Sequence, residues 1–273
     1  MHTTTALVTG ASRGLGLAIV RDLVQEDPQM RVLLAARSPA AANGAAAALR
    51  KQGMDNVYGC TLDVRNQRDI ARFAERHDQI DILINNAAVC PPGWSRQATL
   101  NCWRTNVLGP LTLTQRLLPS MLKRGRGHIV HISSGDGELL YLQTELQAAL
   151  RAAESERDVL RLLASAAPPR NAYGAWPAHG PTPAYAVSKA AVNAIARITA
   201  AQMPQTCRVR VSAICPGDVA TRMLSAHDPE AVRGALPPSK AARDVWRVAT
   251  DGLLSPEVLP NGRFWRHARQ IDF

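Results

Sequence analysis

The chain has 273 residues, of which 46% are hydrophobic and 20% are charged. This length fits one large α/β domain, and this composition excludes an intrinsically disordered chain. The formal net charge of +10 would suit an anionic partner, but the sequence contains no run of five Lys or Arg residues. We therefore expect no nucleic-acid partner.

The amino-terminal residues 1–5 carry no basic segment or long apolar stretch, and no later apolar run reaches the length needed to span a bilayer. We expect a cytoplasmic protein without a membrane partner. The five cysteines form no C-x-x-C pair, so we expect neither a disulfide framework nor a metal site.

Short apolar runs alternate along the chain with segments of helical periodicity. Strands are predicted at residues 6–8, 32–35, 57–62, 80–84, 128–132, 209–214 and 263–265. Helices are predicted at residues 15–24, 39–51, 68–76, 100–122, 184–201 and 240–253. This alternation predicts an α/β fold: a single Rossmann-type domain over residues 1–273 with a doubly wound parallel sheet.

One stretch, at about residues 136–183, interrupts this alternation. It contains a charged, helix-like segment at 145–163 and then Pro-, Gly- and Trp-rich sequence at 168–183. We interpret the stretch as a helical insertion before Tyr185, not as a second domain. Asp136 and Glu138 at its start are expected in a solvated loop; the alternative is that they repel acidic substrates.

A glycine-rich turn follows the first predicted strand and directly precedes a helix. Glycines there let the backbone approach a pyrophosphate, and the helix N-terminus presents free N–H groups to the phosphates. The candidate phosphate-binding residues are Gly10, Ser12, Arg13, Gly14, Leu15 and Gly16. The alternative is that this segment is only a tight strand-to-helix turn.

The end of the second predicted strand indicates which nicotinamide cofactor the chain uses. A carboxylate there would accept the ribose 2′-hydroxyl of NADH, but the strand is followed by Arg37. Arg37 and Arg13 could hold a 2′-phosphate through charge-assisted hydrogen bonds. The sequence therefore favours NADPH/NADP+ as cofactor, although either arginine alone could be an ordinary surface residue.

Tyr185 and Lys189 are four residues apart on a predicted helix, so their side chains share one face. A nearby ammonium lowers the pKa of a phenol and makes it a better proton donor near neutrality. Ser134 follows the strand at 128–132 and could hydrogen-bond to a carbonyl oxygen. The alternative is a half-buried tyrosine beside a surface lysine.

The ordered set of motifs resembles the short-chain dehydrogenase/reductase family over nearly the whole chain. These motifs are T-G-x-x-x-G-x-G at 9–16, Asn85-Asn86-Ala87, Ser134, Tyr185-x-x-x-Lys189 and Pro216-Gly217. The long segment before Tyr185 and the sequence G-L-A-I-V-R at 16–21 further resemble the monomeric carbonyl reductase branch. The resemblance implies a monomer.

The resemblance also implies a role for each matched residue. Tyr185 would be the general acid, Lys189 would lower its pKa and hold the nicotinamide ribose, and Ser134, not Ser133, would orient the carbonyl. Asn106 matches an asparagine that holds a proton-relay water; otherwise it is a polar residue on a helix kinked before Pro110. The cofactor contacts implied are Arg37, Asp63, Val64, Asn86, Ala87, Tyr185, Lys189, Pro216, Gly217, Val219 and Thr221.

These observations predict an enzyme that reduces a small-molecule carbonyl, either a ketone, an aldehyde or a quinone, with NADPH. The same residues could run the reverse reaction, the NADP+-dependent oxidation of a secondary alcohol. A non-catalytic nucleotide-binding or RNA-binding protein with this fold is the alternative from another class.

Overall fold

The computed structural model describes residues 3–91, 95–165, 183–204, 206–255, 259–267 and 269–272. Residues 168–182, the Pro-, Gly- and Trp-rich end of the predicted insertion, lie outside the described residues. Within them, no helix is long and apolar enough to cross a membrane.

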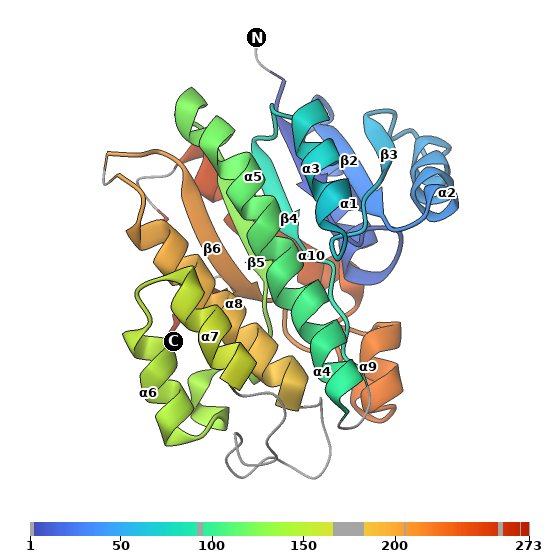
Figure 1. The fold of residues 1–273 in the computed structure, drawn as a ribbon. Helices are drawn as coiled ribbons and strands as arrows, with labels where there is room; N and C mark the ends of the chain where they lie inside the picture. Colours follow the sequence, from blue (N-terminus) through green and yellow to red (C-terminus); the bar gives the residue numbers. More distant parts are fainter. Residues whose placement is uncertain are drawn as a thin grey trace.

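The described strands form a single eight-stranded sheet in the order β3-β2-β1-β4-β5-β6-β7-β8 (Figure 1). Their bounds are β1 (Thr5–Val8), β2 (Arg31–Ala36), β3 (Val57–Thr61), β4 (Ile82–Asn85), β5 (His128–Ile132), β6 (Arg210–Cys215), β7 (Arg263–Arg266) and β8 (Arg269–Ile271). Neighbouring strands from β3 to β7 are parallel, and β8 pairs antiparallel with β7. The doubly wound parallel sheet is confirmed, and β8 is an edge strand that the sequence analysis did not predict.

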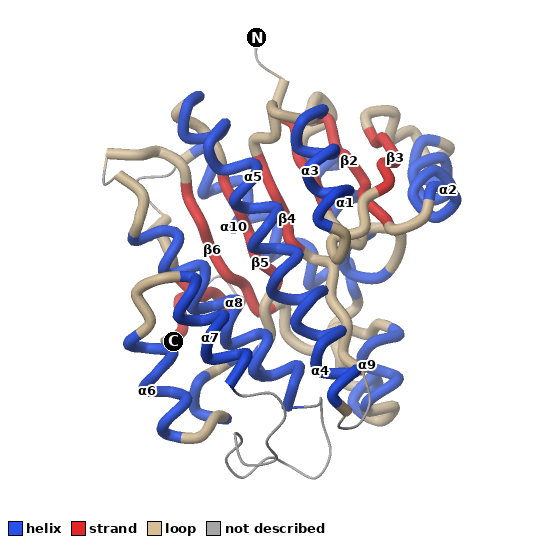
Figure 2. The backbone as a smooth tube through the Cα atoms, in the orientation of Figure 1, coloured by secondary structure: helices blue, strands red, loops and turns tan. Residues whose placement is uncertain are grey.

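Helices cover both faces of this sheet (Figure 2). The main ones are α1 (Gly14–Glu26), α2 (Pro39–Arg50), α3 (Gln67–Arg76), α5 (Gly109–Arg124), α8 (Pro183–Ala201) and α10 (Pro238–Leu254), and the short α9 (Arg222–His227) follows β6. Apolar residues of α1, α2 and α10 form one core with the sheet, and those of α3, α5 and α8 form a second core. The carboxyl ends of the parallel strands are thereby left to loops, which is where open α/β sheets bind ligands.

The helix predicted at 100–122 is divided into three pieces in the structure. They are α4 (Arg96–Trp103), a π-helical turn η1 (Arg104–Leu108) and α5. The amide of Gly109 donates to the carbonyl of Arg104, five residues earlier, and Pro110 has no N–H to donate to the carbonyl of Asn106. Single π-helical turns of this kind are frequent at functional sites.

The insertion contributes two helices, α6 (Thr144–Ala152) and α7 (Glu156–Ser165), that pack with α8 in a third apolar cluster (Figure 1). The Arg197 guanidinium donates to the carbonyls of Leu150 (3.2 Å) and Ala153 (2.8 Å), and the Thr199 hydroxyl donates to Glu156 (3.0 Å). With the sheet on one side and these helices on the other, α8 is buried over most of its length.

Candidate active site

The turn between β1 and α1 depends on glycine at three positions. Gly10 and Gly14 have φ angles of +64° and +57°, in the left-handed region. A Cβ on Gly10 would lie 2.8 Å from Ala87 Cα, and one on Gly16 would lie 2.4 Å from Asn86 Nδ2. No side chain of a described residue caps the N-terminus of α1, so its first-turn N–H groups are available to the phosphates of a dinucleotide.

Thr9 joins this turn to the end of β4. Its hydroxyl oxygen accepts from the amides of Asn86 and Ala87, both at 3.0 Å, and Asn86 Nδ2 donates back to the Thr9 carbonyl at 2.8 Å. Sequence reasoning did not assign Thr9 a role, although its place before the first glycine was the available signal. Ser12 and Leu15 complete the turn and are half-buried.

Of the residues implied for the adenosine side, Arg37 and Asp63 follow β2 and β3, and Arg13 lies directly before α1. Arg37 and Arg13 are exposed, and neither forms an ion pair with a described residue. Asp63 is held by Arg65, whose Nη2 and Nε approach its two carboxylate oxygens at 2.7 and 3.0 Å. This hydrogen-bonded pairing lowers the pKa of Asp63, and Arg37 contributes to the lowering. Sequence reasoning missed Arg65.

The loop after β6 borders the glycine turn. Gly217 has a φ of +77°, and Val219 forms an isolated bridge with Leu236. A Cβ on Gly14 would lie 3.5 Å from the methyl group of Thr221. The structure therefore brings the loop that follows Pro216 next to the predicted phosphate site.

Val64 is buried after β3, with its carbonyl close to the backbone of Gly109.

Lys189 and Tyr185 lie on the first two turns of α8, at the carboxyl end of β5. Lys189 Nζ donates to the carbonyl of Ile132 at 2.6 Å and lies 5.4 Å from the centroid of the Tyr185 ring. Burial lowers the pKa of Lys189 to about 8. The two side chains are thus neighbours, as their spacing on a helix predicts.

The Tyr185 side chain is only 9% exposed. Burial raises its pKa well above the usual value; the charge of Asp136 raises it further, and a hydrogen bond with Ser134 lowers it. Sequence reasoning expected Lys189 to lower this pKa. In the structure burial is the largest cause of the shift and acts in the opposite direction, because a phenolate is costly to form away from water.

Of the two serines after β5, only Ser134 faces Tyr185. Its hydroxyl donates to Asp136 Oδ2 at 2.8 Å and accepts from the Asp136 amide at 3.3 Å. Ser133 is buried, and its hydroxyl donates instead to the carbonyl of Lys189.

The expectation that Asp136 and Glu138 lie in a solvated loop is wrong. Asp136 is half-buried beside Ser134, and burial raises its pKa. Glu138 forms an ion pair with Arg266 of β7. The turn lies against α8 because Gly137 has no side chain: a Cβ there would come within 2.8 Å of the Lys189 backbone.

Asn106 connects η1 to two other parts of the site. Its Oδ1 accepts from the amide of Val89 at 2.8 Å, and its Nδ2 donates to the Val89 carbonyl at 2.9 Å and to Ser188 Oγ at 3.0 Å. Ser188 in turn donates to the carbonyl of Tyr185 at 2.6 Å. Both hydrogens of the Asn106 side-chain amide are therefore used within the protein. Sequence reasoning missed Ser188.

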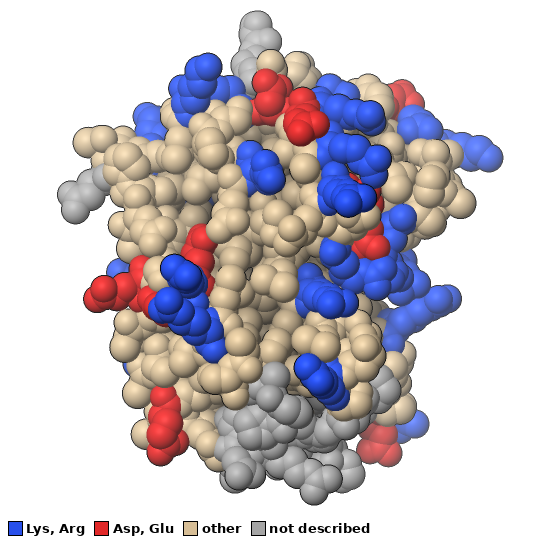
Figure 3. All heavy atoms as spheres, in the orientation of Figure 1, with Lys and Arg blue, Asp and Glu red and all other residues tan. Residues whose placement is uncertain are grey.

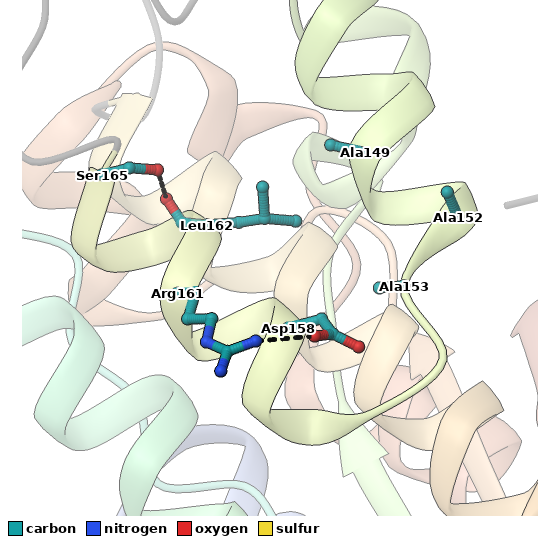
Figure 4. A pocket seen from close by; sticks show the side chains of 7 residues that line it. All are labelled: Ala149, Ala152, Ala153, Asp158, Arg161, Leu162 and Ser165. Atoms are coloured by element: carbon teal, nitrogen blue, oxygen red, sulfur yellow. Dashed lines mark hydrogen bonds and ion pairs between the residues drawn. The ribbon is translucent and has the colours of Figure 1, made fainter.

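Other surface features lie apart from this arrangement. A shallow groove on the insertion is lined by Ala149, Ala152, Ala153, Asp158, Arg161, Leu162 and Ser165, none of them a candidate site residue (Figure 4). Basic side chains are spread over the face shown in Figure 3. Among the described residues, no three His, Cys, Asp or Glu side chains are placed to hold a metal ion.

Comparison with known proteins gives three kinds of match. The family model for short chain dehydrogenase matches residues 4–153 and 178–231. Carbonyl reductase [NADPH] 1 of Pongo abelii is 30% identical over 281 residues, covering 97% of this chain and 95% of that protein. Ketoacyl reductase HetN of Nostoc is 36% identical over 142 residues, so this match spans about half of each protein, 49% and 48%. Salutaridine reductase of Papaver somniferum has a similar structure, with a TM-score of 0.79 and 24% identity over 96% of this chain and 99% of that one.

Proposed function

This chain belongs to the short chain dehydrogenase family of oxidoreductases, and we propose that it reduces a ketone, aldehyde or quinone to an alcohol with NADPH. The observation that carries the proposal is that Ser134, Tyr185 and Lys189 lie together where the carboxyl end of β5 meets the first two turns of α8. A protein that only binds a nucleotide has no need of a buried phenol beside an ammonium. The name of the carbonyl reductase relative agrees with this reaction.

The residues present fit a dinucleotide. Gly10 and Gly16 pack against Ala87 and Asn86 with no room for a Cβ, and the N-terminus of α1 beside them presents N–H groups to which a pyrophosphate can bind. The two exposed arginines, Arg13 and Arg37, are free of described ion pairs and would hold a 2′-phosphate. When bound, the cofactor supplies a hydride to the carbonyl carbon.

The chain supplies the proton and the orientation. Tyr185 keeps its proton at neutral pH, since the ordinary pKa of tyrosine is about 10 and burial raises that of Tyr185 further. Its hydroxyl can therefore donate the proton to the carbonyl oxygen as the C–O bond becomes single. Lys189, held by the Ile132 carbonyl, places a positive charge beside the phenolate that is left. Asn106 keeps η1 and α8 at a fixed separation, which preserves this geometry.

The cofactor pool would decide whether the oxidation of a secondary alcohol competes with reduction, because the same groups serve both directions.

The test combines binding and turnover. NADPH and NADH are titrated into the purified protein by intrinsic fluorescence, and NADPH consumption is then followed with a panel of ketones, aldehydes and quinones. Tyr185→Phe should abolish turnover while the protein still binds NADPH, whereas Tyr58→Phe, which alters an exposed tyrosine on β3, should change neither turnover nor NADPH affinity.

Cofactor choice is tested in the same assay with Arg37→Ala. The loss of one charge-assisted contact should weaken NADPH binding by about tenfold or more and leave NADH binding unchanged. Lys123→Ala, which removes an exposed charge from the last turn of α5, is the control. If the wild-type protein bound neither nucleotide, the proposed enzymatic function would be refuted.

A further inference from the structure

The hydroxyl of Ser134 has one proton, and Asp136 Oδ2 lies in position to accept it. It is donated to Asp136 Oδ2 over 2.8 Å, while the same oxygen accepts from the Asp136 amide. A serine in this arrangement can still accept a hydrogen bond from Tyr185, but it has no hydrogen left for a substrate carbonyl. An ionised carboxylate only accepts hydrogen bonds, whereas a protonated one can donate.

We propose that Asp136 is a positioning residue that sets the direction of the Ser134 hydrogen bond and thereby switches carbonyl activation on and off. When Asp136 is ionised, Ser134 donates its hydrogen to Asp136, and of Ser134 and Tyr185 only Tyr185 donates to the carbonyl oxygen of the substrate. With Asp136 protonated, the carboxyl donates to Ser134 Oγ, and the Ser134 hydrogen turns to the carbonyl. This inference rests on the proposed reductase function.

The charged and titratable groups that face Asp136 come from three sides. They are Tyr185 and Lys189 of α8, Cys215 of β6 with Asp218 of the following loop, and the Glu138–Arg266 pair of its own turn and β7. Burial is the main cause that raises the pKa of Asp136; Asp218 raises it further, and Lys189 lowers it. Protonation of Asp136 therefore occurs at a higher pH than for an exposed aspartate.

Asp136 also acts on the proton donor. Its negative charge is the second cause, after burial, of the raised pKa of Tyr185. Removing that charge should therefore shift the titration of Tyr185 to lower pH. A residue that only stabilised the turn after β5 would leave this titration and the pH dependence of turnover in place.

The test compares Asp136→Asn with Asp218→Asn across a pH series. In the wild type, kcat for carbonyl reduction should fall by about tenfold or more as Asp136 ionises, because one hydrogen bond to the developing oxyanion is lost. Asp136→Asn should remain at the high level throughout, because its amide donates to Ser134 at every pH. Asp218→Asn removes one charge without touching Ser134, so it should keep the fall and move it to lower pH.

A second variant of Asp136 and a titration of Tyr185 test the same inference independently. Asp136→Ala also lacks the carboxylate and should lose the fall, even if the amide variant folds poorly. The ultraviolet titration of Tyr185, isolated by subtracting the Tyr185→Phe spectrum, should move to lower pH in Asp136→Asn. Turnover with an unchanged pH profile in both Asp136 variants overturns this inference alone, whereas a wild type without turnover overturns the proposed function and the inference with it.

Discussion

Two buried histidines on β5, His128 and His131, should make the folded state lose stability in acid. Burial is the main cause that lowers the pKa of His128 to about 4 and that of His131 to about 3, from the ordinary 6.5. The unfolded chain binds protons at these residues near pH 6.5, and the folded chain binds them only near pH 4 and pH 3. Their effect is therefore absent above pH 6.5, and the free energy of unfolding falls as the pH drops from 6.5 toward 3.

The size of the effect follows from the two pKa values of each group. For His128, the difference between 6.5 and about 4 corresponds to about 3 kcal/mol. For His131, the difference between 6.5 and about 3 corresponds to about 5 kcal/mol. A typical domain is stable by about 5–15 kcal/mol, so protonation of these two side chains alone removes much of that stability.

The assay is urea unfolding followed by circular dichroism at a series of pH values between about 7 and 4. His128 contacts the Ala249 carbonyl at 3.1 Å and the Ser212 hydroxyl at 3.0 Å. His128→Gln keeps a polar group there but cannot take up a proton, so the decline of the unfolding free energy with acid should be about 3 kcal/mol smaller. His267→Gln, at an exposed position, should keep the wild-type decline. The same decline in His128→Gln as in the wild type would refute the reasoning.

Two further substitutions test the site's architecture. Gly16→Ala places a methyl group 2.4 Å from Asn86 Nδ2 and should weaken NADPH binding by about tenfold or more in a fluorescence titration. The control is Gly44→Ala on α2, which has open space around its Cβ and should leave NADPH binding unchanged while stabilising the fold by about 0.4–1 kcal/mol. Equal NADPH binding by the two variants would contradict the prediction. Asn106→Ala removes the hydrogen-bond partners of the half-buried Val89 backbone groups and should lower the urea-derived unfolding free energy by roughly 2–4 kcal/mol together with kcat. A loss below about 0.5 kcal/mol would show that these hydrogen bonds do not hold the site.

The fold was largely predictable because apolar runs report burial directly. The strand predicted at 128–132 is β5 with the same bounds, since every residue in it is buried. The helix predicted at 100–122 was wrong as one element, because its periodicity continues through the π-helical turn that the missing N–H of Pro110 accompanies. The edge strand β8 was missed because Arg269 and Gln270 are exposed and polar, so its pairing with β7 leaves no apolar pattern.

The contacts within the site were less predictable, because they join residues far apart in sequence. The four-residue spacing placed Tyr185 and Lys189 correctly on one helix face, because a helix makes residues at that spacing neighbours. The partner of Glu138 is Arg266, 128 residues away, and nothing in the local sequence distinguishes this pair from two solvated charges. The same holds for Thr9, whose hydroxyl serves amides 77 and 78 residues later.

The burial of α8 on nearly every side has a consequence for how substrate range can change in this fold. A helix enclosed by the sheet, η1, α6 and α7 has almost no surface on which substitutions can accumulate freely, so its composition is constrained by volume along its whole length. The loops at the strand ends carry no such constraint. Selection or engineering can therefore change the loops around the carboxyl ends of the strands residue by residue, while the separation of Tyr185 from Lys189 stays as the enclosing layers set it.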